Sequence, residues 1–402
     1  MTAVFSRTLE RHAFGWLVAA NAVGVWLAAL LLWPALGGLA GPFGYGRWMP
    51  LHLNWQLYGW CALPLAGALA AWLVTPDAAG RWHLRLALGA WSAALALGGV
   101  SWLAGVTSGK LFLDWHGWAR PLLPLAMLVL WSVLALHAWL RRGEYGPMGR
   151  ALRGGLLLVL LAVPSLLFWA EGREVYPAVN PHSGGATGAS LLGSTLAILA
   201  VFGALPAFLR VPGRAAWWYW AALAIGAGVF MAADHGDASH HATGQVVALA
   251  ALLPWLVLLP AYLRGFAWHA SARPWLRASF AWWAVLVVTG FLTFLPGWSE
   301  RLKFTNALVA HAHLAMAGLV TSLNLTILRQ LRGGGSCRGF WLWQSGCAVH
   351  VAVLAVLGWR EAEDPAALFL GDGISQAAYA LRLAAGGAML LASVQWWKES
   401  GA

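Results

Sequence analysis

The chain has 402 residues, of which 60% are hydrophobic and only 10% are charged. Soluble globular proteins contain about 45–50% apolar and about 25% charged residues, so this composition excludes a water-soluble fold and indicates an integral membrane protein. The formal net charge of +11 does not indicate a nucleic-acid partner, because the basic residues fall in short loops between apolar segments, where they orient the chain in membrane lipid.

Twelve apolar segments of the sequence have the length of a membrane-spanning helix, which needs about 20 residues to cross a hydrocarbon core of about 30 Å. None of them alternates apolar and polar residues as a membrane β-strand does. In chain order they cover residues 12–37, 51–75, 83–107, 118–140, 151–170, 183–209, 215–233, 241–263, 275–296, 304–328, 339–359 and 374–397. The sequence therefore predicts an all-α polytopic membrane protein of about twelve transmembrane helices, which form a single transmembrane domain over residues 1–402.

The distribution of basic residues along these segments predicts the topology. With the N-terminus in the cytoplasm, 17 of the 25 Lys and Arg residues fall on inner segments and 7 on outer ones, while Arg382 lies within the last span. Of the 14 Asp and Glu residues, only Glu10, Asp77, Glu144 and Glu399 fall inside. Because cytoplasmic loops of membrane proteins are enriched in Lys and Arg, we expect both termini to be cytoplasmic.

The tenth segment contains two histidines, in the sequence Ala310-His311-Ala312-His313. Histidine within a membrane span is uncommon and indicates a functional site. Residues two apart on an α-helix differ by about 200° in direction and about 3 Å in height, so the two imidazoles leave opposite faces at nearly the same depth. This pattern fits ligands of two planar cofactors beside one helix; two unrelated polar packing residues are the alternative.

His52 lies one turn into the second segment, after Arg47-Trp48-Met49-Pro50-Leu51, at a depth comparable to that of the tenth-segment pair. A haem in a helical bundle usually takes axial imidazoles from two helices. The sequence therefore predicts that His52 and one member of the pair form a bis-histidine haem site. Arg47, Arg301 and Lys303 fall at the outer membrane face, where they either bind haem propionates or anchor helices at the interface.

Four further histidines fall at the outer ends of the sixth to eighth segments: His182, His235, His240 and His241. Neutral imidazoles are typical ligands of copper, iron and zinc. These residues are therefore candidate metal ligands. The alternative is a hydrated polar loop, Asp234-His235-Gly236-Asp237-Ala238-Ser239-His240-His241, that binds no specific metal.

Together these residues resemble the catalytic subunit of haem–copper oxidases, and most closely the branch of cbb-type cytochrome c oxidases and nitric oxide reductases. The resemblance is carried by Arg47-Trp48-Met49-Pro50-Leu51-His52 and by Lys303-Phe304-Thr305-Asn306, which leads to Ala310-His311-Ala312-His313. It implies a haem–copper-oxidase-like bundle in which His52 and His313 ligate a low-spin haem b. It further implies that His311 is the proximal ligand of a second, high-spin haem, faced by copper or non-haem iron on His182 and His235.

The same resemblance implies a respiratory-chain oxidoreductase in a bacterial inner membrane, which reduces oxygen or nitric oxide with His311, His182 and His235 at the reacting centre. The sequence contains no C-x-x-C-H motif for covalent attachment of a c-type haem. We therefore expect a c-type cytochrome or a copper protein as electron donor, and additional membrane subunits as partners.

Two departures from the family pattern bear on the chemistry. Gly236 stands where the family usually has a second histidine after His235, and Phe230 lies in the stretch where cbb-type oxidases carry a tyrosine. The alternative function is therefore a non-catalytic haem b subunit that relays electrons and lacks the binuclear site. A transporter with a histidine-lined vestibule is a third possibility, but the pair in the tenth segment faces two directions rather than one pathway.

Overall fold

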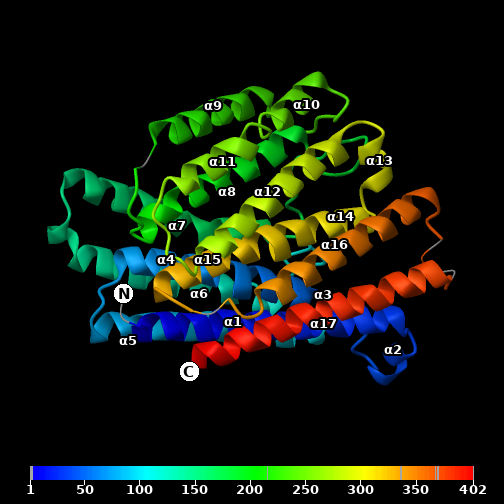
Figure 1. Ribbon diagram of the computed structural model, residues 1–402, viewed down its shortest axis with the longest axis horizontal. Helices are drawn as coiled ribbons and strands as arrows, with labels where there is room; N and C mark the ends of the chain where they lie inside the picture. Colours follow the sequence, from blue (N-terminus) through cyan, green and yellow to red (C-terminus); the bar gives the residue numbers. More distant parts are fainter. Residues whose placement is uncertain (1–2, 215, 336, 367, 369–370, 402) are drawn as a thin grey trace. The chain divides into compact units, whose positions relative to one another are not determined.

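The computed structural model describes residues 3–214, 216–335, 337–366, 368 and 371–401, and over these residues it is helical (Figure 1). The described part contains no β-strand, only the isolated bridges Val179–Ala186 and Gly213–Phe266. The predicted all-α class is confirmed.

Ten segments of the described chain are long and apolar enough to cross a membrane. They are Arg7–Leu32, Ala78–Leu103, Gly117–Leu140, Pro147–Ala170, Gly188–Phe208, Thr243–Arg264, Arg273–Phe294, Asn306–Arg332, Phe340–Glu363 and Gly373–Gly401. The chain is therefore a multi-pass membrane protein, but ten segments, and not the predicted twelve, meet this criterion.

The other two predicted spans are helical but differ from a single long helix. The segment expected at 51–75 is divided into α3 (Tyr45–Asn54), the π-helix η1 (Trp55–Cys61) and α4 (Leu63–Leu73). The segment expected at 215–233 forms α9 (Trp217–Ala233), which has only 17 residues. An interrupted hydrogen-bond pattern and a short helix, rather than a lack of apolar residues, account for the difference.

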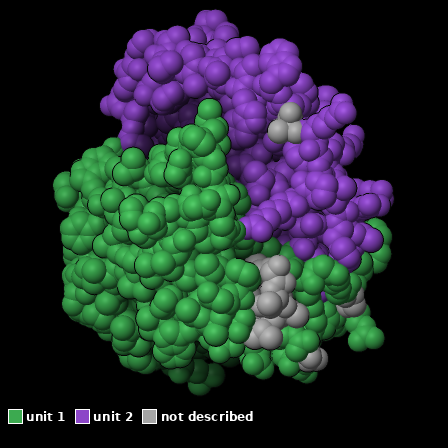
Figure 2. Space-filling view, turned by 90° about the vertical axis from the view of Figure 1, so that its left-hand side faces the viewer, with its two compact units in different colours: residues 1–176, 331–342, 386–402 green, residues 177–330, 343–385 purple. Residues whose placement is uncertain are grey.

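Contacts divide the chain into two compact units, which Figure 2 shows in green and purple. Unit 1 comprises Met1–Tyr176, Leu331–Leu342 and Gly386–Ala402, and unit 2 comprises Pro177–Gln330 and Trp343–Ala385. Besides α3, η1 and α4, unit 1 contains α1 (Ala3–Leu32), α2 (Leu36–Leu39), α5 (Ala78–Leu103), η2 (Gly117–Ala119), α6 (Leu122–Leu140), η3 (Arg142–Glu144) and α7 (Pro147–Ala170).

Unit 2 is built from α8 to α15, with parts of the last two helices. Besides α9, these elements are α8 (Gly188–Phe208), α10 (Thr243–Ala250), α11 (Trp255–Arg264), α12 (Arg273–Phe294), α13 (Trp298–Leu302), α14 (Asn306–His313), the π-helix η4 (Leu314–Val320) and α15 (Thr321–Arg332). The helices α16 (Phe340–Glu363) and α17 (Gly373–Gly401) each contribute residues to both units.

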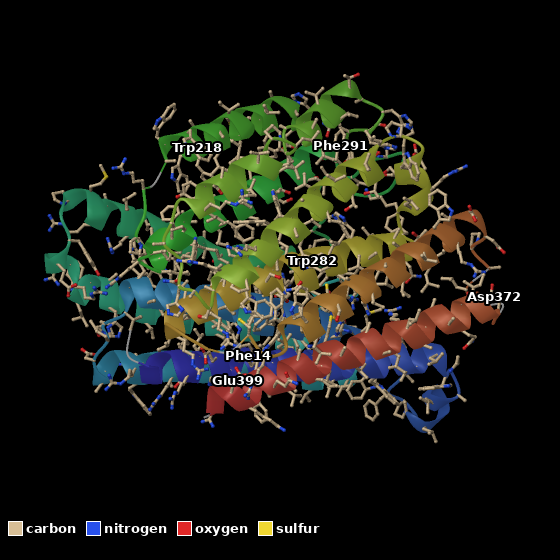
Figure 3. All side chains as sticks on the ribbon, in the orientation of Figure 1. Phe14, Trp218, Trp282, Phe291, Asp372 and Glu399 are labelled. Carbon is tan, nitrogen blue, oxygen red and sulfur yellow. The ribbon has the colours of Figure 1, made fainter. Side chains whose placement is uncertain are left out.

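Large aromatic side chains fill the core of unit 1. The Phe14 ring stacks on Trp60 with centroids 5.6 Å apart and lies 6.0 Å from Trp396 (Figure 3). Trp102 and Trp115 are fully buried and meet edge to face at 4.9 Å. Buried aromatic pairs add packing energy beyond their apolar area, so these contacts fix α1 and α5 against the rest of the unit.

Several polar side chains of unit 2 form hydrogen bonds between helices. The Tyr219 hydroxyl donates to the Leu199 carbonyl at 2.6 Å, and the Trp283 indole donates to the Trp255 carbonyl at 2.7 Å. The Trp282 indole (Figure 3) donates to the Gln344 side-chain oxygen at 2.6 Å. Because an unpaired polar group in a membrane is costly, these bonds hold α9 against α8, and α12 against α11 and α16.

Two seven-residue π-helices occur in the described chain, and both follow a predicted histidine ligand. The π-helix η1 begins three residues after His52, and η4 begins directly after His313. In each case a short α-helix that carries the histidine continues into the π-helix without a loop. Because π-helices are rare and often mark functional sites, these two positions are the strongest structural pointers to a site.

Candidate functional site

In unit 1, a hydrogen bond and a close helix contact hold the His52 ring. Its Nδ1 lies 2.9 Å from the carbonyl oxygen of Ala20 in α1. One turn further along α1, a Cβ at position 24 would lie 2.7 Å from His52 Cε1, so only glycine leaves room for the ring there. The imidazole is thus fixed in direction by both a polar contact and a steric one.

In unit 2, His311 and His313 face different helices, as their two-residue spacing predicts. His311 lies against α12, where its Nδ1 is 3.4 Å from Thr289 Oγ1 and its Cε1 would be 3.0 Å from a Cβ at position 290. His313 lies against α16, with its ring centroid 4.6 Å from that of His350. The His313 Nδ1 is also 2.8 Å from the Val309 carbonyl oxygen in its own helix.

These contacts determine the tautomer of each neutral imidazole. A carbonyl oxygen can only accept, so the Nδ1 atoms of His52 and His313 must carry the hydrogen. The Thr289 hydroxyl donates to the Val285 carbonyl at 2.7 Å, so it too can only accept from His311 Nδ1. In all three rings Nε2 is therefore the nitrogen with a lone pair. A histidine that ligates a metal usually shows this arrangement, with its other N–H donated to a carbonyl or similar acceptor.

The start of α14, which carries His311 and His313, is held by α16. The Glu361 carboxylate accepts from the backbone N–H of Asn306 at 2.7 Å and from its side-chain amide at 3.1 Å. The Thr305 hydroxyl caps the same helix by accepting from the Ala307 N–H at 3.1 Å. Both caps are within two turns of the histidines, so they fix the position of the helix that presents the two rings.

A second group of polar side chains in unit 2 could hold a metal ion: His240, His241 and Glu300, each of which offers one ligand atom within 4.8 Å of the others. The Nε2 atoms of the two histidines lie 2.8 and 2.9 Å from the same carboxylate oxygen of Glu300. The His182 ring is close by, with its centroid 5.0 Å from that of His241. Three of the four predicted outer histidines are thus brought together, and a carboxylate joins them.

Glu300 was not predicted as a ligand from the sequence. Burial alone would raise the pKa of Glu300, but hydrogen bonds from its own backbone N–H, from His240 and from the Gly297 amide outweigh it and lower the pKa to about 2. The group is therefore a carboxylate, the form that binds cations. Its only sequence signal is an acid beside a predicted outer helix end, which is too common to identify a ligand.

The hydrogen bonds of His240 in the structure place its hydrogen on the nitrogen that a metal would need, and so they oppose metal binding. The Asn180 side-chain amide lies 2.6 Å from His240 Nδ1, and its oxygen accepts from the His182 backbone N–H at 3.1 Å. This orientation of the amide makes Nδ1 of His240 an acceptor, so its Nε2 carries the hydrogen and donates to Glu300. A metal at Nε2 therefore requires the ring to change tautomer.

The remaining predicted site residues lie apart from this group. His235 is exposed, in the loop after α9. Gly236 next to it adopts a φ of 77°, and this turn carries the chain on to His240, which is fully buried. The structure leaves His235 outside the metal-binding group, so its predicted role stays a prediction.

The three predicted cations have different surroundings. The Arg47 guanidinium of unit 1 lies 3.5 Å from the Leu103 carbonyl oxygen. Arg301 in unit 2 is exposed. Burial lowers the pKa of Lys303, whose side chain packs against Gly185 in the turn that follows His182. Lys303 is thus the cation that lies near the metal-binding group.

The metal-binding group and His311 both contact α12. The His240 ring meets the Phe294 ring edge to face at 6.0 Å, and His311 contacts Thr289 and Gly290. Positions 289 and 294 are separated by about 7.5 Å along the helix. Within unit 2, one helix therefore links the two candidate sites. His52 belongs to unit 1, and its pairing with His313 stays a prediction.

The sequence matches no protein-family model, and no curated protein matches it. The resemblance to haem–copper oxidases is therefore carried by the residues around His52 and by the H-x-H pair of α14. What that resemblance implies for cofactors, partners and reaction is a proposal.

Proposed function

We propose that the chain is a haem-containing membrane subunit of a respiratory chain, resembling the catalytic subunit of cytochrome c oxidases, that reduces oxygen or nitric oxide. One observation carries this proposal: His52, His311 and His313 each engage Nδ1 with an acceptor and so keep the lone pair on Nε2. Three membrane histidines with the tautomer of an iron ligand, two of them followed by π-helices, are unexpected for packing residues alone.

The residues present fit haem as ligand. His52 and His313 would hold a low-spin haem b, and His311 a high-spin haem. When bound, haem iron held by two of these imidazoles would transfer electrons, and haem iron held by one would also leave a position for oxygen or nitric oxide. The chain's contribution is to orient the rings through their Nδ1 hydrogen bonds and through the glycine contacts that leave space for them. Arg47, Arg301 and Lys303 would neutralise the propionates.

The same proposal assigns His182, His240, His241 and Glu300 to copper or non-haem iron. Two imidazoles and a carboxylate within 4.8 Å form a donor set that suits either metal. His235 would complete it only through a movement of the loop after α9. Because the group shares α12 with His311, electrons and a small ligand could meet between the two sites.

A second candidate function is a haem b subunit that passes electrons without reducing a substrate. The Asn180 amide favours it, because it holds His240 in the tautomer that does not bind a metal through Nε2. Under this alternative the His240–Glu300–His241 contacts are structural hydrogen bonds at the end of the bundle. A metal analysis separates the two candidates.

The proposal includes partners and a location. A c-type cytochrome or a copper protein would donate electrons, and further membrane subunits would join the chain in a bacterial inner membrane. Both termini would be cytoplasmic, as the distribution of Lys and Arg predicts.

Absorption spectra of the purified, dithionite-reduced protein, recorded before and after carbon monoxide, test the proposal. We expect haem b bands, part of which carbon monoxide shifts. His52→Ala and His313→Ala should remove the low-spin bands, and His311→Ala the carbon-monoxide-sensitive part. His269→Ala is the matched control, because its Nδ1 bonds only to the nearby Ser271 at a helix end. A colourless protein after expression with haem precursors would refute the function. Bound haem that does not respond to carbon monoxide, in a protein with neither copper nor non-haem iron, would establish the second candidate.

A further inference from the structure

Four side chains at one end of unit 1 form a continuous chain of hydrogen bonds, independent of the histidines discussed so far. His83 Nδ1 in α5 lies 3.0 Å from His137 Nε2 in α6. The other nitrogen of His137 lies 2.9 Å from Thr75 Oγ1, and the Thr75 hydroxyl donates to Asp77 Oδ1 at 2.9 Å. The chain runs from the exposed Asp77 carboxylate through His137, which is 1% exposed, to the half-buried His83.

The direction of every hydrogen bond follows from the carboxylate. Hydrogen bonds from the Gly80 amide and then from Thr75 lower the pKa of Asp77, so this group accepts only. A hydroxyl has one hydrogen, so Thr75, which donates to Asp77, must accept from His137 Nδ1. His137 Nε2 must then accept from His83 Nδ1. All donors therefore point the same way, from His83 to Asp77.

The turn that carries Thr75 and Asp77 is tightly built. Asp77 caps α5 by accepting from the Gly80 N–H at 2.7 Å. A Cβ at position 80 would lie 2.1 Å from the Thr75 carbonyl oxygen, so no larger residue fits there without moving the turn. The relation between hydroxyl, carboxylate and helix end is thus set by the backbone.

The charged groups around the two imidazoles belong to the same end of unit 1. The Arg141 guanidinium, after α6, interacts electrostatically with His137 and forms an ion pair with Glu144 at 2.9 Å. The Arg81 guanidinium in α5 interacts electrostatically with the Asp77 carboxylate. Since two imidazolium rings with nitrogens 3.0 Å apart would repel each other and Arg141 adds a like charge, the His83–His137 pair holds one extra proton at most.

We propose that His83, His137, Thr75 and Asp77 form a proton relay that connects the half-buried His83, through the buried His137, with the solvent at Asp77. A proton that arrives at His83 Nε2 lets His83 Nδ1 release its proton to His137 Nε2. His137 Nδ1 then releases its proton to Thr75 Oγ1, and the Thr75 hydroxyl proton passes to the Asp77 carboxylate. One proton enters at His83 and one leaves to water at Asp77; the reverse sequence carries a proton from water to His83 and restores the starting state, so the relay exchanges protons in both directions.

This proposal does not depend on haem or on a second metal. It concerns only unit 1, and its ligand is a proton. The predicted topology places this end of α5 and α6 on the cytoplasmic side, where a membrane enzyme that consumes protons would take them up.

Nitrogen-15 NMR of histidine-labelled protein in detergent micelles tests the relay through the tautomer of His137 and the exchange rate of its Nδ1–H with water. His83→Gln and His137→Gln identify the signals. We expect a single Nδ1–H tautomer for His137 in the wild type and in Thr75→Ser, which keeps the hydroxyl. Thr75→Val has nearly the same shape but no hydroxyl, and it should mix the tautomers and slow proton exchange about tenfold or more.

The sign of the exchange effect separates a relay from a structural hydrogen bond. If Thr75 only holds His137 in place, its loss in Thr75→Val opens the site, and exchange becomes faster. Asp77→Asn is a second test, because Asn still caps α5 but cannot take up a proton, so exchange should again slow. Thr75→Ser keeps the hydroxyl and should leave the exchange rate unchanged. Faster or unchanged exchange in Thr75→Val and Asp77→Asn would overturn the relay.

Discussion

Replacing Asn180 by Asp should strengthen metal binding at the His240–His241–Glu300 group. In the wild type the Asn180 amide donates to His240 Nδ1 at 2.6 Å, and both side chains are fully buried. Metal binding at His240 Nε2 moves the ring hydrogen to Nδ1, where it faces the amide N–H and loses this hydrogen bond. An unsatisfied buried donor costs about 1–3 kcal/mol, which corresponds to about 5- to 150-fold in a dissociation constant.

An aspartate at position 180 removes this cost, because its carboxylate accepts from His240 Nδ1–H and still accepts from the His182 N–H. Carboxylates that orient a ligating histidine change metal affinity by about 10- to 100-fold. We therefore expect Asn180→Asp to bind Zn²⁺ about 10- to 100-fold more tightly than the wild type. Calorimetric titration of the detergent-solubilised, metal-free protein with Zn²⁺ measures the difference directly.

Two further variants calibrate this experiment. His235→Gln changes an exposed histidine outside the group and should leave the dissociation constant unchanged, whereas His241→Gln removes a ligand and should weaken binding in both backgrounds. Equal or weaker Zn²⁺ binding by Asn180→Asp, in a protein whose melting temperature is retained, would refute the tautomer argument. Weaker binding in His235→Gln would show that the loop after α9 moves to supply a ligand.

Three other variants have defined outcomes. Because the pKa of Glu300 is lowered to about 2, the stability that this carboxylate contributes to the fold is complete above pH 4.5 and is lost as the pH falls towards 2. The melting temperature of the wild type should therefore decrease across this window, whereas that of Glu300→Gln should not. Glu171 is buried without a hydrogen-bond partner among the described residues, and burial raises its pKa to about 8. The free energy of unfolding of the wild type should therefore fall from pH 4.5 to pH 8, because the carboxyl must ionise in a buried position, whereas that of Glu171→Gln should not. The difference at pH 8 is on the order of a few kcal/mol. Gly24→Ala should lower the haem content measured by pyridine haemochrome spectra, because the added Cβ would lie 2.7 Å from His52. Gly15→Ala in the same helix is the control and should not lower it, because its Cβ would lie 3.7 Å from the nearest neighbour. The same haem content in Gly24→Ala as in the wild type would contradict the assignment of His52.

Hydropathy predicted the helical class and the positions of most spans, but not how the helices are interrupted. The eighth predicted span consists of α10 and α11 separated by a turn that ends at Pro254. The π-helices η1 and η4 have ordinary apolar sequences. Hydropathy reflects the free energy of moving side chains from water to lipid, whereas these interruptions depend on which backbone carbonyl accepts the hydrogen bond of each N–H. The backbone geometry therefore had to come from the structure.

The candidate site was predicted unevenly for a similar reason. His182, His240 and His241 are rare residues for a membrane protein and stand out by composition, and the structure brings them together. Glu300 lies 59 residues beyond His241 in the chain, and no local pattern marks it. The spacing of His311 and His313 determines their opposite directions through helix geometry alone. The acceptors of their Nδ1–H groups are the Thr289 hydroxyl and the Val309 carbonyl, and these contacts could not be predicted.

The π-helices have a consequence for how the chain tolerates insertions and deletions. A π turn contains about one residue more than an α turn, so the seven residues of η4 rotate the chain by nearly as much as six α-helical residues would. Deletion of one residue from η4 would therefore let the helix continue as α and would leave α15 in nearly its present direction relative to α14. Nine of the twelve residues of α15 are buried, and they would keep their contacts, whereas deletion of one residue from α15 itself would rotate the residues after it by about 100°. The π-helix is thus the place in this span where the chain can lose one residue without turning the imidazoles away from their partners.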